Sequence, residues 1–305
     1  MVTNREMETA SHPDFAPTIW ADDTNDALEY EMVLPTLVNT SYESQMTLGR
    51  ILRIPIRGNL DTQTKTEGVG NTITFQAPVG TSTEYGVGTS PATHQDVTVS
   101  TYEYAAQLLN SVLAVQSNYD ERTRTAHALG YALARGVEVT IAALFGSFSQ
   151  IVGTLGADPD DAILRRAWQY LADVGVQDNA TFVLNPSAIA ALFGSDKFTS
   201  GDFVGKKVIE SATLPMIYGY GVVRSNLLAT SGTGVNCALL HKNSIILIRQ
   251  IQPTVREQFL IRNIADGIVA YNLYAAEEAA WSAEAPTDDA DPTVGDFGAV
   301  LIRTN

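Results

Sequence analysis

The sequence reads SNYDERTRTAHALGYALARGVEVTIAALFG from Ser117 to Gly146, and this pattern predicts one long amphipathic helix. Ser117 is a suitable N-cap, and Gly146 ends the run. Apolar residues recur at steps of three or four and fall on one stripe: Leu129, Leu133, Val137, Ile141 and Leu144. At 1.5 Å per residue the helix would be about 40–45 Å long. It is either a long core helix or a spine that crosses the molecule and carries two lobes.

Two further features of the same stretch bear on its neighbours. Asp120 can reach Arg124 one turn on, and Arg135 can reach Glu138, so the pattern predicts ion pairs along the helix. Small residues make the helix slender, so other backbone can lie close against it: Ala126, Ala128, Gly130, Ala132, Ala134 and Gly136.

The composition is that of a folded protein long enough for two cores. The chain has 305 residues, of which 45% are hydrophobic and 17% charged. The sequence shows no apolar run of eighteen residues and no apolar core of a signal peptide near its start, so no membrane span is expected. The single cysteine, Cys237, excludes an intrachain disulfide framework and fits a reducing compartment. A net charge of −15 argues against a surface that binds nucleic acid.

The first fifty residues predict an acidic arm. Residues 1–20 form no core of their own, and 22–39 look helical until Pro35 interrupts the pattern. From Glu6 to Glu43 there are nine acidic residues and no lysine or arginine. The charge then reverses at Arg50.

An extended two-stranded ribbon is expected next. Residues 51–57 alternate, with Leu52, Ile54 and Ile56 on one face, and 72–79 alternate with Phe75 among the apolar positions. A polar tip, 58–70, joins them. A two-stranded ribbon is marginal in water unless its apolar face is covered. The ribbon therefore folds back on its own chain or lies on a neighbouring copy, and the neighbour is the preferred interpretation.

The second half of the chain has the pattern of a compact α/β lobe followed by a returning hairpin. Residues 160–174 predict a helix with Trp168 on its inner face, and Asn185-Pro186 predicts the start of a helix that ends at Phe193. Asp266-Gly267 is a hairpin-turn signal between two strands. The other expected strands are 181–184, 217–224, 237–240, 244–249 and 299–302, and 277–296 form an acidic surface tail.

The sequence shows no catalytic or metal-binding constellation. The histidines His12, His94, His127 and His241 are scattered, with no spacing that would bring two onto one metal ion. His127 and Cys237 are interpreted as structural residues. Nucleophile-elbow, zinc-protease and phosphate-loop motifs are absent from the sequence. We therefore expect no enzyme activity, no cofactor and no metal.

The order of these parts resembles the tailed-phage major capsid protein of the Hong Kong 97-type fold. The likeness is carried by an arm, a hairpin, a spine helix, and a lobe that contains Thr181–Leu192, Leu214-Pro215 and Val222–Asn226. Ala238–Ile246 then lead into a returning hairpin. The resemblance covers residues 20–280 and rests on order and spacing, because no single motif is diagnostic. It implies an α+β fold with an N-terminal arm, 1–48; an E-loop, 49–100; a peripheral domain, 101–155 and 250–305; and an axial domain, 156–249.

The resemblance also implies a function. Such proteins self-assemble into hexamers and pentamers of an icosahedral shell that encloses double-stranded DNA, so the expected location is the virion, after synthesis in the host cytoplasm. The sequence has no long N-terminal coiled coil, which implies a separate scaffolding protein; a portal protein and a cement protein are further candidate partners. Some relatives cross-link a loop lysine to a neighbour's asparagine. Lys65 is the only lysine on this loop, and no cross-link is predicted for it.

We expect the contacts between copies to join the acidic arm of one chain to the basic root of the ribbon of another. Exposed pairs of this kind contribute about 0–1 kcal/mol each. The expected intersubunit residues are Asp22, Asp23, Asp26, Glu29, Arg50, Leu52, Arg53, Ile54, Ile56, Arg57 and Phe75.

Three alternatives stay open. An encapsulin-type shell has the same fold and encloses cargo enzymes in place of DNA. A soluble oligomeric α+β enzyme would require a pocket with convergent titratable groups. A capsid-decorating or carbohydrate-binding β protein does not fit the thirty-residue helix.

Overall fold

The long helix predicted from the sequence is the central element of the structure. The computed structural model describes residues 29, 32–55, 94–110, 121–173, 175, 178–194, 214, 216–279 and 298–305. Within it, α3 spans Glu121–Leu144. A 3-10 turn, η3, continues it over Phe145–Ser147. The predicted stripe is confirmed, because its first four members are buried and Leu144 packs against the core that contains Val137 and Ile141. The expected start of the helix, 117–120, lies outside the described residues.

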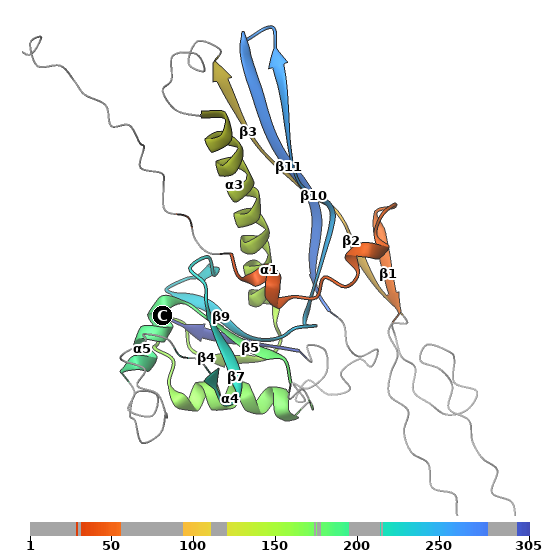
Figure 1. Cartoon of the computed structure of the whole chain (residues 1–305). Helices are drawn as coiled ribbons and strands as arrows, with labels where there is room; N and C mark the ends of the chain where they lie inside the picture. The colour runs from red at the N-terminus through yellow and green to blue at the C-terminus, as the bar shows by residue number, and fades with distance from the viewer. Residues whose placement is uncertain are drawn as a thin grey trace, which may run out of the picture.

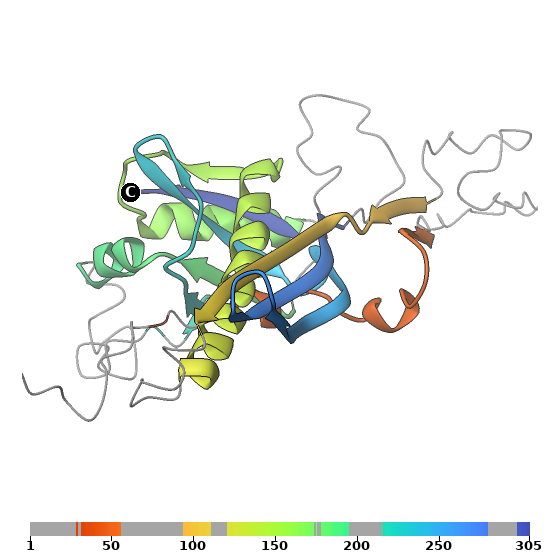
Figure 2. The ribbon, with the colours of Figure 1, turned by 90° about the horizontal axis from the view of Figure 1, so that it is seen from above.

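A three-stranded antiparallel sheet lies along α3. Its strands follow the order β10-β11-β3, with β3 at Thr101–Asn110, β10 at Ile245–Leu260 and β11 at Ala265–Glu278. The helix and the long β10–β11 hairpin extend side by side away from the lobe (Figure 1), and the view from above shows α3 against one face of the sheet (Figure 2). Leu129 and Leu133 pack there against Ile268, Ala270 and Ala105.

Close approach between α3 and β3 depends on a glycine. A Cβ atom added at Gly136 would collide with the carboxylate of Glu103 on β3. The small residues in the helix sequence predicted a close approach of other backbone, whereas at Gly136 the close neighbour is a side chain.

The hairpin turn differs from the prediction. The turn occupies 261–264, where Ile264 has a φ of 48°, and Asp266 and Gly267 lie inside β11 opposite Phe259 and Gln258. Asp266 and Gly267 pair with β10 on one side and with β3 on the other. Arg122 of α3 also binds the Asp266 carboxylate at 3.0 Å. These contacts with distant parts of the chain accompany a turn placed earlier than the local signal predicted.

A second, mixed sheet forms the core of the lobe. The path of strands is β4-β12-β9-β5-β7-β6, and β8 pairs with β9. Two helices accompany it: α4, Asp161–Asp173, and α5, Pro186–Phe193. The strands are β4, Ile151–Gly153; β5, Ala180–Leu184; β6, Met216–Ile217; β7, Tyr220–Arg224; β8, Thr230–Ser231; β9, Gly234–His241; and β12, Ala299–Thr304.

Local sequence signals explain the helices of the lobe. Asn185 caps α5, because its Oδ1 accepts the N–H of Ala188 at 2.9 Å, and Pro186 occupies the first turn. α4 buries Leu164, Ala167 and Leu171. Trp168 was expected on the same face but is 40% exposed, so that prediction is wrong. Trp168 lies at the edge of the narrow stripe of α4 that faces the core, and the smaller side chains of Leu164, Ala167 and Leu171 fill that stripe.

Sheet membership differs in two places from the division into parts expected from the sequence. β4 and β12 belong to the sheet of the lobe, although the expected axial domain was 156–249. Residues 244–249 were expected in that sheet, but 245–249 begin β10 and pair with β11. Ile245 and Leu247 still contribute to the core of the lobe, so the first residues of β10 connect both parts. The domain boundaries themselves stay a prediction.

The described N-terminal segments wrap around the base of the hairpin. α1, Leu34–Leu37, is a single turn that contains Pro35 near its start. Most of the helical stretch expected before this proline lies outside the described residues. After η2, Glu43–Gln45, strand β1, Ile51–Pro55, pairs antiparallel with β2, His94–Thr98. The sequence predicted 72–79 as the partner; those residues lie outside the described part of the chain.

Candidate functional site

The residues predicted to join copies of the chain are described only in part. Six of them, Asp22, Asp23, Asp26, Ile56, Arg57 and Phe75, lie outside the described residues, as does Lys65. The structure places the other five at the root of the ribbon and beside α3.

The apolar root of the ribbon is covered by its own chain. Leu52 and Ile54 are half-buried and pack on a cluster that joins the ribbon to the segment before it and to the base of the hairpin. The buried members of that cluster are Met46, Val97, Val99, Ile246, Ile248, Ala275 and Ala279. Part of the cover for these two side chains thus comes from the same chain, namely from β2, the base of the hairpin and Met46 of the segment before the ribbon. That a neighbouring copy covers the remaining surface stays a prediction.

The charged residues of the prediction also have partners within the chain. Arg53 Nε lies 3.0 Å from Asp96 Oδ1 on the facing strand, although the Arg53 side chain is 69% exposed. Glu29 Oε1 lies 3.4 Å from Nδ1 of His127, so this histidine is an exposed residue of α3 and not a core residue. Arg50 is exposed. Exposed pairs of this kind are weak, which leaves these side chains able to exchange partners.

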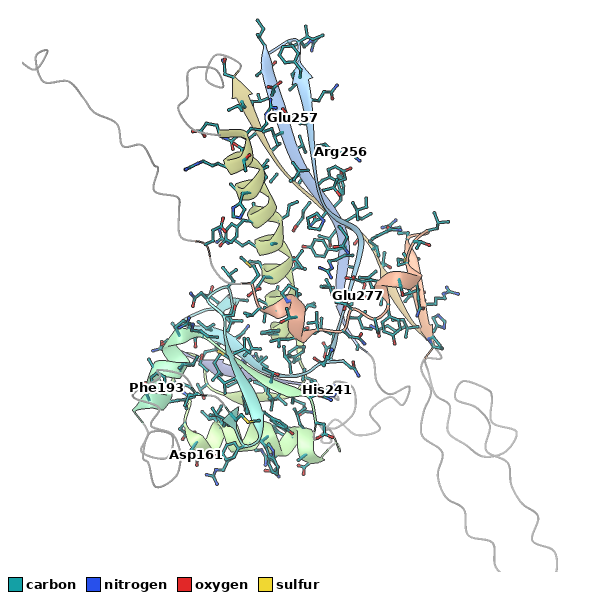
Figure 3. All side chains as sticks on the ribbon, in the orientation of Figure 1. Asp161, Phe193, His241, Arg256, Glu257 and Glu277 are labelled. Carbon is teal, nitrogen blue, oxygen red and sulfur yellow. The ribbon has the colours of Figure 1, made fainter. Side chains whose placement is uncertain are left out.

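Two contacts fasten the segment before β1 to the hairpin, and the sequence indicated neither. Arg249 of β10 binds Glu43 with Nε 2.6 Å from Oε1. One residue further, the side-chain amide of Gln250 donates to the carbonyl of Gly49 at 2.9 Å. On the other side of this junction the backbone N–H of Thr98 donates to Glu277 at 3.1 Å (Figure 3).

A buried carboxylate was also missed. Glu138 was expected to pair with Arg135 on the surface of α3, but its side chain is fully buried and Arg135 is exposed. Its oxygens accept the N–H groups of Val33 and Leu34 and the hydroxyl of Ser225. Burial raises the pKa of the Glu138 carboxyl, and the three hydrogen bonds oppose that shift.

A polar contact also lies between α3 and the sheet. The hydroxyls of Tyr274 and Thr140 are 2.8 Å apart, and burial raises the pKa of Tyr274 to about 12, with the Glu103 carboxylate adding to the shift. Asn272, on the same strand, is buried. Within the described residues no hydrogen-bond partner is found for its side-chain amide.

Large apolar side chains are exposed at the end of the hairpin farthest from the lobe. We call Phe259, Leu260, Ile261 and Ile264, with Leu108 of β3, the hairpin-tip surface; Ile261 is 84% exposed. At this end Glu257 binds Arg122 of α3 at 2.8 Å, and Arg256 beside it lies on the other face of the strand (Figure 3). Exposed apolar groups of this size indicate contact with another molecule.

A second exposed surface lies on the face of the sheet turned away from α3. Tyr102 and Tyr104 of β3 are 59% and 70% exposed, and the ring of Tyr271 lies 6.1 Å from that of Tyr102. We call these three residues the tyrosine face. Tyrosine is common in protein–protein interfaces because it buries a large area and keeps a polar end.

The groups that could carry chemistry are dispersed. In the part of the chain that the structure describes, no three His, Cys, Asp or Glu side chains form a possible metal site. Cys237 is buried, and burial raises its pKa, so it is held as a thiol. α3 with η3 is long and apolar enough to cross a membrane. One of its faces packs on the sheet, and the buried Glu138 on another side contacts the segment at α1 and the lobe, as in the core helix of a globular protein.

Comparisons with known proteins place this arrangement among capsid structures. No model of a known protein family matches the sequence, and neither does any curated protein. Among solved structures, one from Mycobacterium phage Che8 has a TM-score of 0.74 at 21% identity, over 94% of this chain and 97% of that one. The capsid of cyanophage P-SCSP1u has a TM-score of 0.73 at 12% identity, over 100% and 97%. The capsid of a native GTA particle has a TM-score of 0.69 at 10% identity, over 99% of each chain.

At these identities the likeness establishes the fold. The chain has the Hong Kong 97-type capsid fold, an α+β fold with a spine helix, a returning hairpin and a compact lobe. The fold expected from the sequence is therefore confirmed.

Proposed function

We propose that this chain is a major capsid protein that self-assembles into hexamers and pentamers of an icosahedral shell around double-stranded DNA. The observation that carries the proposal is the match to capsid chains over nearly the full length of both proteins, at TM-scores of 0.65 to 0.74. A match that left out the hairpin, the ribbon or the lobe would support only a shared domain. A structural role, without an active site, follows from the same proposal.

The exposed surfaces support assembly from many copies. The hairpin-tip surface and the tyrosine face both lie on the part that extends away from the lobe, where a monomer gains nothing from exposed apolar groups. The net charge of −15 fits a container for DNA, because walls that repel phosphate let DNA move and pack.

For the contacts between copies we propose that the arm carboxylates of one chain meet the arginines of another chain's ribbon. Asp22, Asp23, Asp26 and Glu29 are the acidic residues, and Arg50, Arg53 and Arg57 the basic ones. The exposure of Arg50 and Arg53 supports this pairing. Leu52, Ile54, Ile56 and Phe75 stay candidates for apolar contact with a neighbour. A separate scaffolding protein, a portal protein and a cement protein are proposed partners, and the virion is the proposed location.

Electron microscopy of the purified protein tests the proposed function. We expect closed hollow shells, and the particles isolated from their natural source should contain DNA that resists nuclease until they are opened. Shells filled with an enzyme would replace the proposal with an encapsulin-type compartment. A small discrete oligomer without shells would overturn it.

The proposed arm contact needs a test that separates it from the pair within the ribbon. Arg53→Gln and Asp96→Asn each remove the Arg53–Asp96 pair, but only the first removes the arginine. If Arg53 meets a neighbour's arm, Arg53→Gln slows assembly at low salt while Asp96→Asn assembles at the normal rate. Equal effects of the two variants would assign Arg53 to the ribbon alone. Circular dichroism of each variant checks that the subunit is folded.

A further inference from the structure

The Glu138 carboxylate lies where three parts of the chain meet. Oε2 accepts the backbone N–H groups of Val33 and Leu34, at 2.8 and 3.2 Å, and Oε1 accepts the hydroxyl of Ser225 at 3.0 Å. Val33 directly precedes α1 and Leu34 is its first residue, whereas Ser225 follows β7 in the lobe. One side chain on the spine helix therefore holds the arm with one oxygen and the lobe with the other.

This carboxylate is buried among neutral groups. The donors are two amides and a hydroxyl, and in the described residues no Lys, Arg or His nitrogen pairs with Glu138. α1 and residues 225–229 carry no ionisable side chain, while Arg135 on α3 and Arg224 before Ser225 are exposed. A buried carboxylate without a cation is costly unless its hydrogen bonds are complete. The arrangement is therefore stable only when both the arm and the lobe are in place.

The apolar packing around the Glu138 carboxylate also requires both the arm and the lobe to be in place. Leu34, directly after Val33, is fully buried in the core that Val137 and Ile141 of α3 share with the lobe. Ser225 is 2% exposed and closes the site from the lobe side. If Ser225 moved away, Oε1 would lose its partner, and the side chain would turn toward water and withdraw Oε2 from the two amides.

We propose that Glu138 couples docking of the N-terminal arm to the position of the lobe on the spine helix. The arm binds at Val33 and Leu34 while Ser225 holds the carboxylate, and a lobe movement that withdraws Ser225 releases the arm. By linkage, docking of the arm stabilises the lobe position seen here to the same degree. Within a shell this coupling would let a rearrangement of the lobe change what the arm contacts; that consequence alone rests on the proposed function.

Hydrogen–deuterium exchange in the full-length unassembled chain tests the coupling without requiring a shell. The peptide that contains residues 33–38 is compared between the wild type, Ser225→Ala and Glu138→Ala. In the described residues no hydrogen bond joins Ser225 to the arm, yet we expect Ser225→Ala to raise the exchange rate of this peptide about fivefold or more. Glu138→Ala should raise it further. Residues 235–240 of β9 should exchange at the wild-type rate and so show that the lobe is folded.

Two variants serve as controls. Thr140 lies on α3, as Glu138 does, but its hydroxyl contacts Tyr274 of β11 and not the arm. Thr140→Val removes that hydrogen bond and should leave the hydrogen–deuterium exchange of residues 33–38 unchanged. Glu138→Gln keeps the geometry, because its amide oxygen can accept both N–H groups and its NH2 can donate to Ser225, so exchange should stay within about twofold of wild type.

The proposal is overturned if Ser225→Ala leaves the arm peptide at the wild-type rate while Glu138→Ala accelerates it, because Glu138 would then be a local anchor. It is also overturned if Thr140→Val accelerates the peptide as much as Ser225→Ala, which would indicate general loosening of α3. Should Ser225→Ala fail to fold, Ser225→Cys keeps the size, weakens the hydrogen bond and serves the same comparison.

Discussion

Arg249 holds Glu43 in a two-pronged ion pair, with Nε 2.6 Å from Oε1 and Nη2 3.3 Å from Oε2. The two residues are 206 positions apart in the sequence, yet their side chains are only 32% and 20% exposed. The pair joins η2, just before the ribbon, to the base of β10. Because bidentate geometry fixes both side chains, this contact orients the ribbon on the rest of the molecule.

Arg249→Met should lower the free energy of unfolding by about 1–3 kcal/mol, because it leaves a largely buried carboxylate without its partner. The matched control is Arg53→Met on β1, which breaks the pair with Asp96, where the two side chains are 69% and 35% exposed, and should cost about 0–0.5 kcal/mol. Urea denaturation measures both. Equal losses for the two variants would contradict the role given to Arg249.

Gly136 and Gly130 should respond differently to alanine. Both lie inside α3, where alanine stabilises a helix by about 0.5–1 kcal/mol relative to glycine. A Cβ at Gly130 meets nothing within 4 Å, so Gly130→Ala should show that gain. A Cβ at Gly136 would displace the Glu103 carboxylate, which is the terminal group of a flexible side chain, so Gly136→Ala should raise the melting temperature less than Gly130→Ala does.

The double variant identifies the cause. Combining Gly136→Ala with Glu103→Ala removes the displaced carboxylate, and the double variant should be more stable than the sum of the two single changes. Thermal unfolding of all four proteins completes the cycle. Strict additivity would show that Glu103 is not what Gly136 accommodates.

The parts that the sequence predicted correctly are those determined by local periodicity or capping. The apolar stripe of α3 follows from steps of three and four, and the start of α5 follows from Asn185-Pro186. The apolar runs at 181–184 and 237–240 also appear within β5 and β9, as predicted. In each case the signal lies within a few residues of the element that it predicts.

The parts that could not be predicted depend on partners far away in the chain. Glu138 looks like a surface residue one turn from Arg135, and only the folded chain brings Val33 and Ser225 to it. The sequence predicted 72–79 as the partner of 51–55, whereas 94–98 pair with them in the structure. Residues 94–98 lie just before β3, which belongs to the sheet along α3, so this pairing depends on the fold of the whole chain. The in-chain cover of Leu52 and Ile54 was missed for the same reason.

The stability of the Glu138 site should depend on pH in a definite direction. Burial raises the pKa of this carboxyl above its value in the unfolded chain, so the folded chain binds the proton more tightly. The free energy of unfolding therefore falls as pH rises through the raised pKa and recovers on acidification. Glu138→Gln has no charge to bury and keeps the hydrogen bonds.

We therefore expect the stability advantage of Glu138→Gln over wild type to be close to zero at about pH 4 and to grow toward about pH 8. Urea denaturation at the two pH values measures it. A difference that is the same at both pH values would show that the charge of Glu138 has no cost in the folded chain.

Tyr274 should make the fold sensitive to alkali. Burial raises its pKa from 10.0 to about 12, so between these values the folded chain keeps a proton that the unfolded chain has lost. The free energy of unfolding should fall by about 2–3 kcal/mol in all as pH rises across this range.

Tyr274→Phe cannot ionise but loses the bond to Thr140, so it should be about 1 kcal/mol less stable than wild type at neutral pH. The stability difference between Tyr274→Phe and wild type should shrink and then reverse at high pH. Tyr104→Phe, on the exposed face of β3, is the control for loss of a surface phenol. A deficit that stays constant across this range would show that the Tyr274 hydroxyl ionises without opposition from its surroundings.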